Sequence, residues 1–404
     1  MRLIHTSDWH LGQTLHEQDR SYEHAAFLDW LLATLEREQP ELLVIAGDVF
    51  DSVNPPISAQ RQLYRFVVEA TRRLPRMTLA MIAGNHDSGA RIEMPAPLLA
   101  GFNAHAIGRV PWRVDGSLDA GRLLLPVPGA DGAIAGWVLA LPFLRPAELG
   151  AAGGDYPAAI ARVHAELIDH ARSLRQPGQA LVAVSHAHLA GGATSDSERN
   201  LVAGGAEALS PTLFTADIDY VALGHLHLAQ AVAGPTTIRY CGSPLPLSFA
   251  EAGYPHQVLR VDIEPGAPAV VESLPVPRAL PLLRVPQAGP APLAEVLAEL
   301  AALGLPELPL EQRPWLQVRV LLDAPMVDLR QRIEAAVAGQ PLRLVHIKPE
   351  YAQREGSDEA PPSFAPASPA ELFARAWERR YGCAPDARAL ADFALIESEA
   401  EAGE

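Results

Sequence analysis

Five short clusters of aspartate, asparagine and histidine are spread over the first 230 residues of the chain. Their side chains offer oxygen and nitrogen atoms but no thiolate, a mixture that suits manganese, iron or zinc. One such cluster alone is common by chance, but five in series predict a metal centre. The clusters are Asp8-Trp9-His10, Gly47-Asp48, Gly84-Asn85-His86-Asp87, Ser185-His186-Ala187-His188 and Gly224-His225-Leu226-His227.

The spacing within the clusters suggests how some side chains reach a common point. Asp8 and His10 are two residues apart, so in an extended segment they project to the same side. Gly47 and Gly84 let the backbone approach an ion closely. Trp9 lies between two candidate ligands and is expected to pack beneath them.

Two positions in the clusters leave alternatives open. His186 is preferred to His188 as a ligand because it comes first after the apolar run. Asp87 either orients His86 as a hydrogen-bond partner or stabilises the turn that carries it.

Each cluster stands at the end of a short apolar run, and such runs flanked by polar turns are typical of buried strands. Amphipathic stretches at 22–37 and 58–73 alternate with them, which predicts an α/β domain. Ligand sites in such sheets lie at the carboxyl ends of the strands, where all five clusters fall. The runs are 3–4, 41–48, 78–87, 137–142, 180–188 and 219–227.

The character of the chain changes around residues 250–280. Apolar and amphipathic stretches between 280 and 347 are typical of a strand, helix, strand, helix, strand order, which predicts a small α+β domain. Residues 352–368 are rich in proline, serine and charge, which indicates a linker. The predicted division is therefore 1–255, 256–351, a linker at 352–368, and C-terminal helices at 369–404.

The C-terminal stretch has clear helix signals. Ser368 is a helix cap, Pro369 fits the first helical position, and Glu371 completes a capping box. Two amphipathic helices are expected, and their apolar sides either fold back on the protein or capture a partner. The apolar positions are Leu372, Phe373, Ala376, Trp377, Tyr381, Leu390, Phe393 and Ile396.

Composition narrows the functional classes. The net charge of −16 argues against a protein that grips nucleic acid through its overall field, although two divalent cations would add about four positive charges at the site. The single lysine, Lys348, excludes a phosphate-binding-loop lysine from the first 347 residues. No apolar run is long enough for a membrane span, and Cys241 and Cys383 lack metal-site spacing. A cytoplasmic protein is expected.

The order D-x-H, G-D, G-N-H-D, H and G-H-x-H resembles the calcineurin-like metallophosphoesterase family over residues 1 to about 250. The resemblance implies two sheets flanked by helices, with two divalent metals, preferably Mn²⁺. Matched by motif, one metal takes Asp8, His10, Asp48 and His227. The second takes Asn85, His186 and His225 and shares Asp48, while His86 matches the catalytic histidine that donates to the phosphate or protonates the leaving oxygen.

Within the family, the sequence is most similar to nuclease subunits that work with a coiled-coil ATPase. The matching stretches are 5–15, 23–32, 46–56, 82–88, 223–230, 239–249 and the C-terminal segment around 369–386. The resemblance implies exonuclease and single-strand endonuclease activity on DNA ends and hairpins. It also implies a capping domain at 256–351, C-terminal helices that bind the ATPase, and a dimer. Some relatives carry a histidine where this chain has Asp51, so its role stays open.

Several of these residues also have an ordinary structural interpretation. The amphipathic helix at 58–73 is either ordinary packing or part of a dimer interface. Arg91, Arg109, Arg113 and Arg145 either contact DNA phosphates or lie solvated on the surface. The alternative functions are a small-molecule phosphodiesterase and a non-catalytic scaffold. A small-substrate enzyme needs neither the extra domain nor the tethered helices, and the intact ligand set argues against a scaffold.

Overall fold

The structure is a computed structural model of the 404-residue chain. It describes residues 1–149, 156–194 and 208–351, together with a few single positions beyond them. These positions are Phe373, Trp377, Pro385, Ala389, Leu390 and Phe393. By its internal contacts the chain divides into Met1–Glu350 and Tyr351–Glu404.

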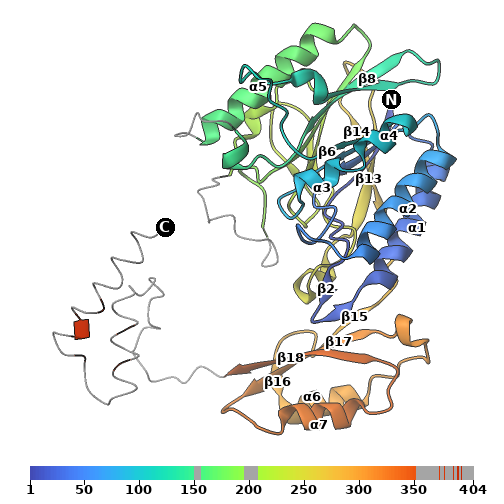
Figure 1. Ribbon diagram of the computed structural model, residues 1–404. Coiled ribbons are helices and arrows are strands. Elements are labelled where there is room, and N and C mark those ends of the chain that lie inside the picture. The colour runs from blue at the N-terminus through green and yellow to red at the C-terminus, as the bar shows by residue number, and fades with distance from the viewer. Residues whose placement is uncertain are drawn as a thin grey trace. The chain divides into compact units, whose positions relative to one another are not determined.

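Two six-stranded sheets form the larger part of Met1–Glu350 (Figure 1). The central strands of each sheet run parallel. Antiparallel strands close both edges of the second sheet and one edge of the first, whose other edge, β6, pairs parallel with β5. The first sheet has the order β14 (Val270–Pro275), β13 (Gln257–Asp262), β1 (Arg2–Thr6), β4 (Leu42–Ala46), β5 (Thr78–Ile82), β6 (Ala104–Ile107). The second has the order β11 (Gln230–Val232), β12 (Ile238–Tyr240), β10 (Tyr220–Gly224), β9 (Ala180–His186), β8 (Ile134–Leu141), β7 (Leu124–Pro128).

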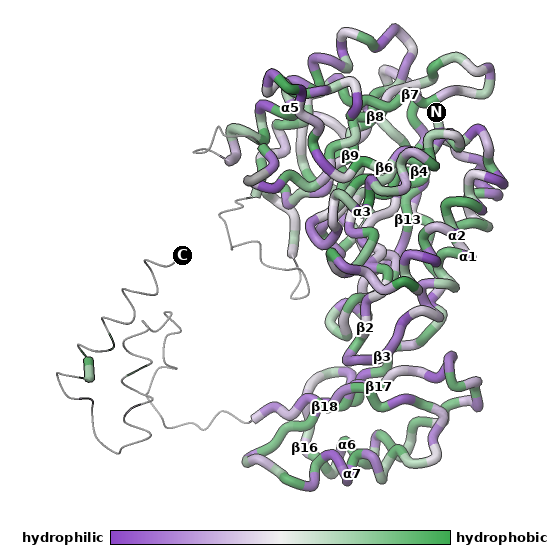
Figure 2. The backbone as a smooth tube through the Cα atoms, in the orientation of Figure 1, coloured by the Kyte–Doolittle hydropathy of each residue, from purple (hydrophilic) through white to green (hydrophobic). Residues whose placement is uncertain are grey.

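The sheets pack face to face, and helices cover their outer faces. α1 (Ser21–Glu38) and α2 (Ile57–Arg73) pack on the first sheet, and α5 (Tyr156–Leu174) packs on the second. A third core of side chains such as Val44, Val138 and Val182 fills the space between the sheets. Strands covered on both faces have no polar side to present, which is why the predicted runs are continuously apolar (Figure 2).

The buried face of α2 confirms the packing interpretation of that helix. Leu63, Phe66, Val67 and Ala70 are all buried against the first sheet and α1. Trp9 lies in the same core, with its ring edge-on to Phe66 at a centroid distance of 5.3 Å. Two shorter helices, α3 (Gly89–Glu93) and α4 (Ala96–Leu99), follow β5.

A smaller sheet with its own core follows at residues 282–351, which we call the small lobe. Its strands are β15 (Leu282–Val285), β17 (Trp315–Leu322), the two-residue β16 (Ala291–Pro292) and β18 (Arg343–Tyr351). Helices α6 (Leu293–Ala301) and α7 (Leu329–Val337) bury side chains such as Val296 and Ile333 against it. This is the strand and helix order that the sequence predicts, with β16 added.

The expected boundary at 255/256 differs from the sheet topology. Residues 257–275, assigned from sequence to the capping domain, form β13 and β14 at the edge of the first sheet. The reason is that β13 pairs antiparallel with β1 near the start of the chain, a long-range contact that no local pattern reveals.

The predicted linker and most of the C-terminal helices lie outside the described residues. Among the positions that are described there, the ring of Phe373 stacks on Phe393 with centroids 4.4 Å apart, and Trp377 lies 5.6 Å from Phe373. Across the described parts of the chain, none of the helices has the length and apolar character that crossing a bilayer requires.

Candidate metal centre

All seven predicted ligands lie at the carboxyl ends of five parallel strands. Asp8 and His10 follow β1, Asp48 follows β4, and Asn85 follows β5 in the first sheet. In the second sheet His186 ends β9, while His225 and His227 follow β10. Because the two sheets face each other with these ends on one side, residues from opposite halves of the fold meet there.

The backbone at the site corrects one premise of the sequence analysis. Asp8 and His10 do not lie in an extended segment, since β1 ends at Thr6 and both residues have positive φ angles of 53° and 45°. Asp48 and His225 also have positive φ, at 47° and 106°. Non-glycine residues in this region cost about 1–3 kcal/mol each, and such strain gathers at functional sites. The two side chains converge through tight turns rather than strand alternation.

The glycines allow the close approach that the sequence predicts. A Cβ atom on Gly84 would lie 2.2 Å from the Asp48 Oδ1 atom, and one on Gly47 would lie 2.3 Å from the His186 Nδ1 atom. Any side chain at either position would push apart the loops that bear the candidate ligands.

One group of ligand atoms contains Asp8, His10 and His227, whose atoms all lie within 4.8 Å of one another. The Asp48 Oδ2 atom lies 3.7 Å from the His10 Nε2 atom. These are the four residues that the resemblance assigns to one metal.

A second group surrounds the amide oxygen of Asn85. That oxygen lies 2.9 Å from the His186 Nε2 atom and 3.0 Å from the His225 Nδ1 atom. Asp48 again takes part, with its Oδ2 atom 3.4 Å from the His186 Nε2 atom. His186 also belongs, with Asp8 and Asp48, to a group whose ligand atoms all lie within 4.8 Å of one another. Among the described residues, His188 is in no such group, and its ring centroid is 6.2 Å from that of His225.

Three of the imidazoles have their second nitrogen held by an outer partner. His10 Nδ1 lies 3.2 Å from the Asp51 carboxylate, and His186 Nδ1 donates to the Ala46 carbonyl oxygen at 2.8 Å. His227 Nδ1 lies 2.9 Å from the fully buried carboxylate of Glu251. Outer contacts of this kind fix the tautomer and the ring orientation of a metal-binding histidine.

His86 lies beside the first group. One of its ring nitrogens is within 4.8 Å of ligand atoms of His10 and Asp48, and its ring is edge-on to His10 with centroids 4.8 Å apart. Its Nδ1 donates to the carbonyl oxygen of Asp51 at 2.8 Å. Asp51 therefore orients His10 through its side chain and His86 through its backbone.

Asp87 and Arg145 secure the loop that carries Asn85 and His86. The Asp87 carboxylate accepts hydrogen bonds from the backbone N–H groups of Val49, Phe50 and Gly84, which is the turn-stabilising role of the two considered. Arg145, on the loop after β8, donates to the carbonyl oxygens of residues 84, 85 and 87. From the sequence, Arg145 is expected only to contact DNA phosphates or to lie solvated on the surface.

The charged groups influence one another strongly. Burial raises the pKa of the Asp8 carboxyl. Burial acts the same way on Asp48, but the positive charge of His186 and its hydrogen bond hold the Asp48 pKa well below its usual range. Burial alone would lower the pKa of His186, yet the Asp48 charge raises it to about 9.

The residues present fit divalent cations. The His10 Nε2 atom is buried without a hydrogen-bond partner and lies beside two carboxylates, so it has a lone pair to offer. The set joins carboxylate, amide and imidazole ligands, as predicted. Burying two carboxylates together is costly unless a cation compensates them.

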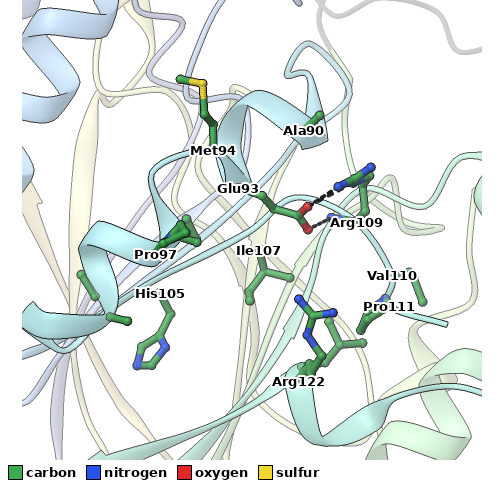
Figure 3. Close-up of a pocket in the computed structure, with 15 residues that line it drawn as sticks. Ala90, Glu93, Met94, Pro97, His105, Ile107, Arg109, Val110, Pro111 and Arg122 are labelled. Atoms are coloured by element: carbon green, nitrogen blue, oxygen red, sulfur yellow. Dashed lines mark hydrogen bonds and ion pairs between the residues drawn. The ribbon is translucent and has the colours of Figure 1, made fainter. Parts of the chain in front are cut away.

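The other arginines singled out from sequence have partners within the fold. Arg109 pairs with Glu93 at 2.7 Å, Arg113 with Asp119 at 3.2 Å, and Arg91 donates to Asn54. The Arg109–Glu93 pair borders a hollow of about 610 Å³ at the β6 edge of the first sheet, and none of the seven predicted ligands lines it (Figure 3).

Comparisons with known proteins agree with this geometry. Residues 1–229 match the model of the family described as calcineurin-like phosphoesterase, and residues 278–381 match the type 5 capsule protein repressor C-terminal domain. A protein from Rhodobacter capsulatus, named as the D subunit of the nuclease SbcCD, is 39% identical, with 93% of this chain and 94% of that protein covered. Proteins of the same name from Escherichia coli K12 and Bacillus subtilis are 33% and 32% identical, covering 88% and 99% of this chain and 86% and 99% of their own lengths.

Proposed function

Because the chain belongs to the calcineurin-like phosphoesterases, in the group of the SbcD nuclease subunits, we propose that its metal centre hydrolyses phosphodiester bonds in DNA. The observation that carries this proposal is the meeting of seven oxygen and nitrogen ligands, with His86 beside them, at five strand ends. The small-molecule alternative is not favoured, since relatives that match most of the chain are named as nuclease subunits.

The proposed ligand sets follow the two groups of atoms. Asp8, His10 and His227 would hold one divalent cation, Asn85, His186 and His225 would hold the other, and Asp48 would be shared by both. Bound divalent cations would stabilise the phosphate as Lewis acids and would lower the pKa of water, so that hydroxide is available to attack the phosphorus. We take Mn²⁺ as the preferred ion.

The protein's own side chains would orient the reacting groups and protonate the phosphate or the leaving oxygen. His86, whose Nδ1–H donates to the Asp51 carbonyl, would have to be doubly protonated to give a proton from Nε2 to the phosphate or to the leaving oxygen, and would become neutral in that step. Asp87 and Arg145 fix the loop that carries His86 and Asn85, so the two act from a preorganised position.

The proposed substrates are linear DNA ends and hairpins, cut as a double-strand exonuclease and a single-strand endonuclease. The proposed partner is the SbcC coiled-coil ATPase, as the name of the relatives indicates. We propose a homodimer within a heterotetramer, serving DNA repair, recombination and replication in the cytoplasm. The small lobe acts as the capping domain that positions DNA, and the C-terminal helices after the linker bind SbcC.

The experiment compares substrates under one set of conditions. Metal-free protein is loaded with Mn²⁺ and given linear duplex DNA, hairpin DNA and a chromogenic diester, with and without SbcC. We expect degradation of both DNA forms, stimulated by SbcC. Cleavage of the diester with no action on DNA, even with SbcC, would favour the small-molecule activity instead.

His86→Ala tests the division between ligands and the catalytic side chain. We expect Mn²⁺ binding to stay at the wild-type level while cleavage falls by about 10²–10⁴-fold, the usual contribution of a positioned acid. His170→Ala, a histidine of α5, is the matched control and retains activity. Loss of a metal ion in His86→Ala would make His86 a ligand.

Truncation before Ser368 tests the proposed role of the C-terminal helices. The shortened protein is expected to keep its basal nuclease activity and to lose co-purification with SbcC. Unchanged co-purification would place the SbcC contact elsewhere in the chain.

A further inference from the structure

A short helical segment, η5 (Phe249–Gly253), lies between the metal centre and the small lobe. It follows the loop after β12 and precedes β13. Its residues contact a candidate ligand on one side and the small lobe on the other, so this one segment is in contact with both.

Towards the metal centre, the contact is made by Glu251. Its carboxylate is fully buried and bonds through both oxygens: Oε1 to His227 Nδ1 at 2.9 Å and Oε2 to the backbone N–H of Leu247 at 2.7 Å. A buried carboxylate with two donors has a fixed orientation, and it passes that orientation to the imidazole.

Towards the small lobe, the contacts are made by Phe249. Its ring belongs to a small core with Leu15, Leu280 and Trp315, of which Trp315 is fully buried at the start of β17. Its carbonyl oxygen accepts a hydrogen bond from Arg284 of β15.

Arg284 is itself fixed within the small lobe. Its Nε atom donates to the Gln317 side chain on β17 at 3.1 Å, and Gln317 in turn contacts His346 on β18. The hydrogen bond to the Phe249 carbonyl therefore comes from a group that moves with the lobe, not from a free surface side chain.

We propose that η5 couples the small lobe to the metal centre: Glu251 is a positioning residue for His227, and the lobe, through Arg284 and Trp315, fixes the position of Glu251. A displacement of the lobe then changes the orientation of His227 and with it the affinity of one metal position. Whatever engages the small lobe, substrate or partner, thereby tunes the site.

The test measures metal binding rather than cleavage. Metal-free protein is titrated with Mn²⁺ alone, and free Mn²⁺ is followed by electron paramagnetic resonance. Glu251→Gln keeps the size of the side chain but presents one N–H group to a donor. One of the two sites is expected to weaken by about 10–100-fold, the usual effect of losing an outer partner of a metal ligand. Glu264→Gln, an exposed glutamate, is the control and binds like wild type.

A second variant separates the lobe from Glu251. Arg284→Met keeps the apolar stem and removes the hydrogen bond to η5, and the same site is expected to weaken by on the order of 10-fold. Arg319→Met is matched to it, since Arg319 lies on β17 in the same sheet but pairs with Glu350. It leaves both sites at wild-type affinity. An equal loss in Arg284→Met and Arg319→Met would overturn the coupling.

Since His227 is a ligand only under the proposed function, His227→Ala is measured alongside. Loss of one site in His227→Ala with wild-type binding in Glu251→Gln overturns the coupling and leaves the proposed function intact. Two intact sites in His227→Ala overturn both.

Wild-type protein supplies a measurement that no folding defect can affect. The ¹⁵N shifts of His227 in the metal-free protein are expected to show the proton on Nδ1, where Glu251 accepts it. A proton on Nε2 alone would overturn the positioning role.

Discussion

His5 is a buried side chain whose protonation makes the stability of the fold depend on pH. It lies in β1 between the sheets and is fully buried. Its Nε2 donates to the Leu223 carbonyl oxygen at 3.1 Å, so Nδ1 accepts from the Tyr220 hydroxyl at 2.9 Å. Burial, chiefly, lowers the pKa of this imidazole from 6.5 to about 3.

The stability of the protein should therefore fall on the acid side. Below pH 6.5 the unfolded chain takes up a proton on His5, while the folded chain does so only near pH 3. The contribution of neutral His5 to the free energy of unfolding is complete above the pKa of the unfolded state. It declines as the pH falls from 6.5 towards 3, by about 1.4 kcal/mol per pH unit for one proton. Urea unfolding of metal-free protein, with a chelator present, should show a shallower pH dependence in His5→Gln than in wild type. Equal slopes would contradict it.

Residue types at strand ends were predictable, but their partners were not. His186 and Asp48 stand directly after apolar runs, a local pattern that sequence reveals. Glu251 bonds to His227 across a separation of 24 residues in the sequence. Nothing in the sequence around Glu251 indicates this contact. The positive φ angles of Asp8 and His10 also follow from tertiary packing, which overrides the extended geometry that the spacing suggested.

At the scale of elements, Arg145 is one of the links between the two sheets. It comes from the loop after β8 in the second sheet, and its guanidinium donates to three carbonyl oxygens of the loop after β5 in the first. Its charge also lies over the Phe143 ring, 5.6 Å from the centroid. The loop with Asn85 and His86 is thus fixed from the opposite sheet.

Arg145→Met removes these hydrogen bonds and the charge over the Phe143 ring, and keeps an unbranched apolar side chain. We expect DNA cleavage to fall by about 10²-fold, since small displacements of a reacting group have effects of that size. Arg113→Met, which removes a half-exposed ion pair on a separate loop, is the control. The comparison uses cleavage rates at saturating Mn²⁺ together with the thermal midpoint. A drop in midpoint with no change in rate would assign Arg145 to stability alone.

Elements with strong local patterns were predictable, and those defined by distant pairing were not. β4, β5, β9 and β10 are five to seven residues long and wholly buried, so their sequences are apolar over most of their length. β14 is mostly exposed and β16 has only two residues, so neither shows the hydrophobic periodicity by which a strand is recognised in a sequence. Their places depend on the strands beside them, β13 and β17.

At the scale of the whole molecule, the net negative charge of the protein opposes the binding of DNA, its proposed substrate. The chain carries a net charge of −16, with 48 acidic side chains against 32 basic ones. Its long-range field repels DNA, whose binding ordinarily depends on releasing counterions from phosphates with lysine and arginine. The proposed metal centre reverses this locally, since two divalent cations add about four positive charges where a phosphate must lie.

DNA affinity of the isolated protein should therefore depend on the metal more than on the protein surface. In His86→Ala, which is expected to bind without cutting, duplex DNA should bind weakly without divalent ions, with a Kd of about 10⁻⁵ M at physiological salt. Adding Mn²⁺ should strengthen binding about tenfold or more, equal to about 1.4 kcal/mol. Fluorescence anisotropy of labelled duplex measures both values, and His86→Ala combined with Asp48→Asn, which removes the proposed bridging ligand, should show no such gain. Tight, steeply salt-dependent binding without metal would mean that a local basic surface outweighs the field of the whole chain.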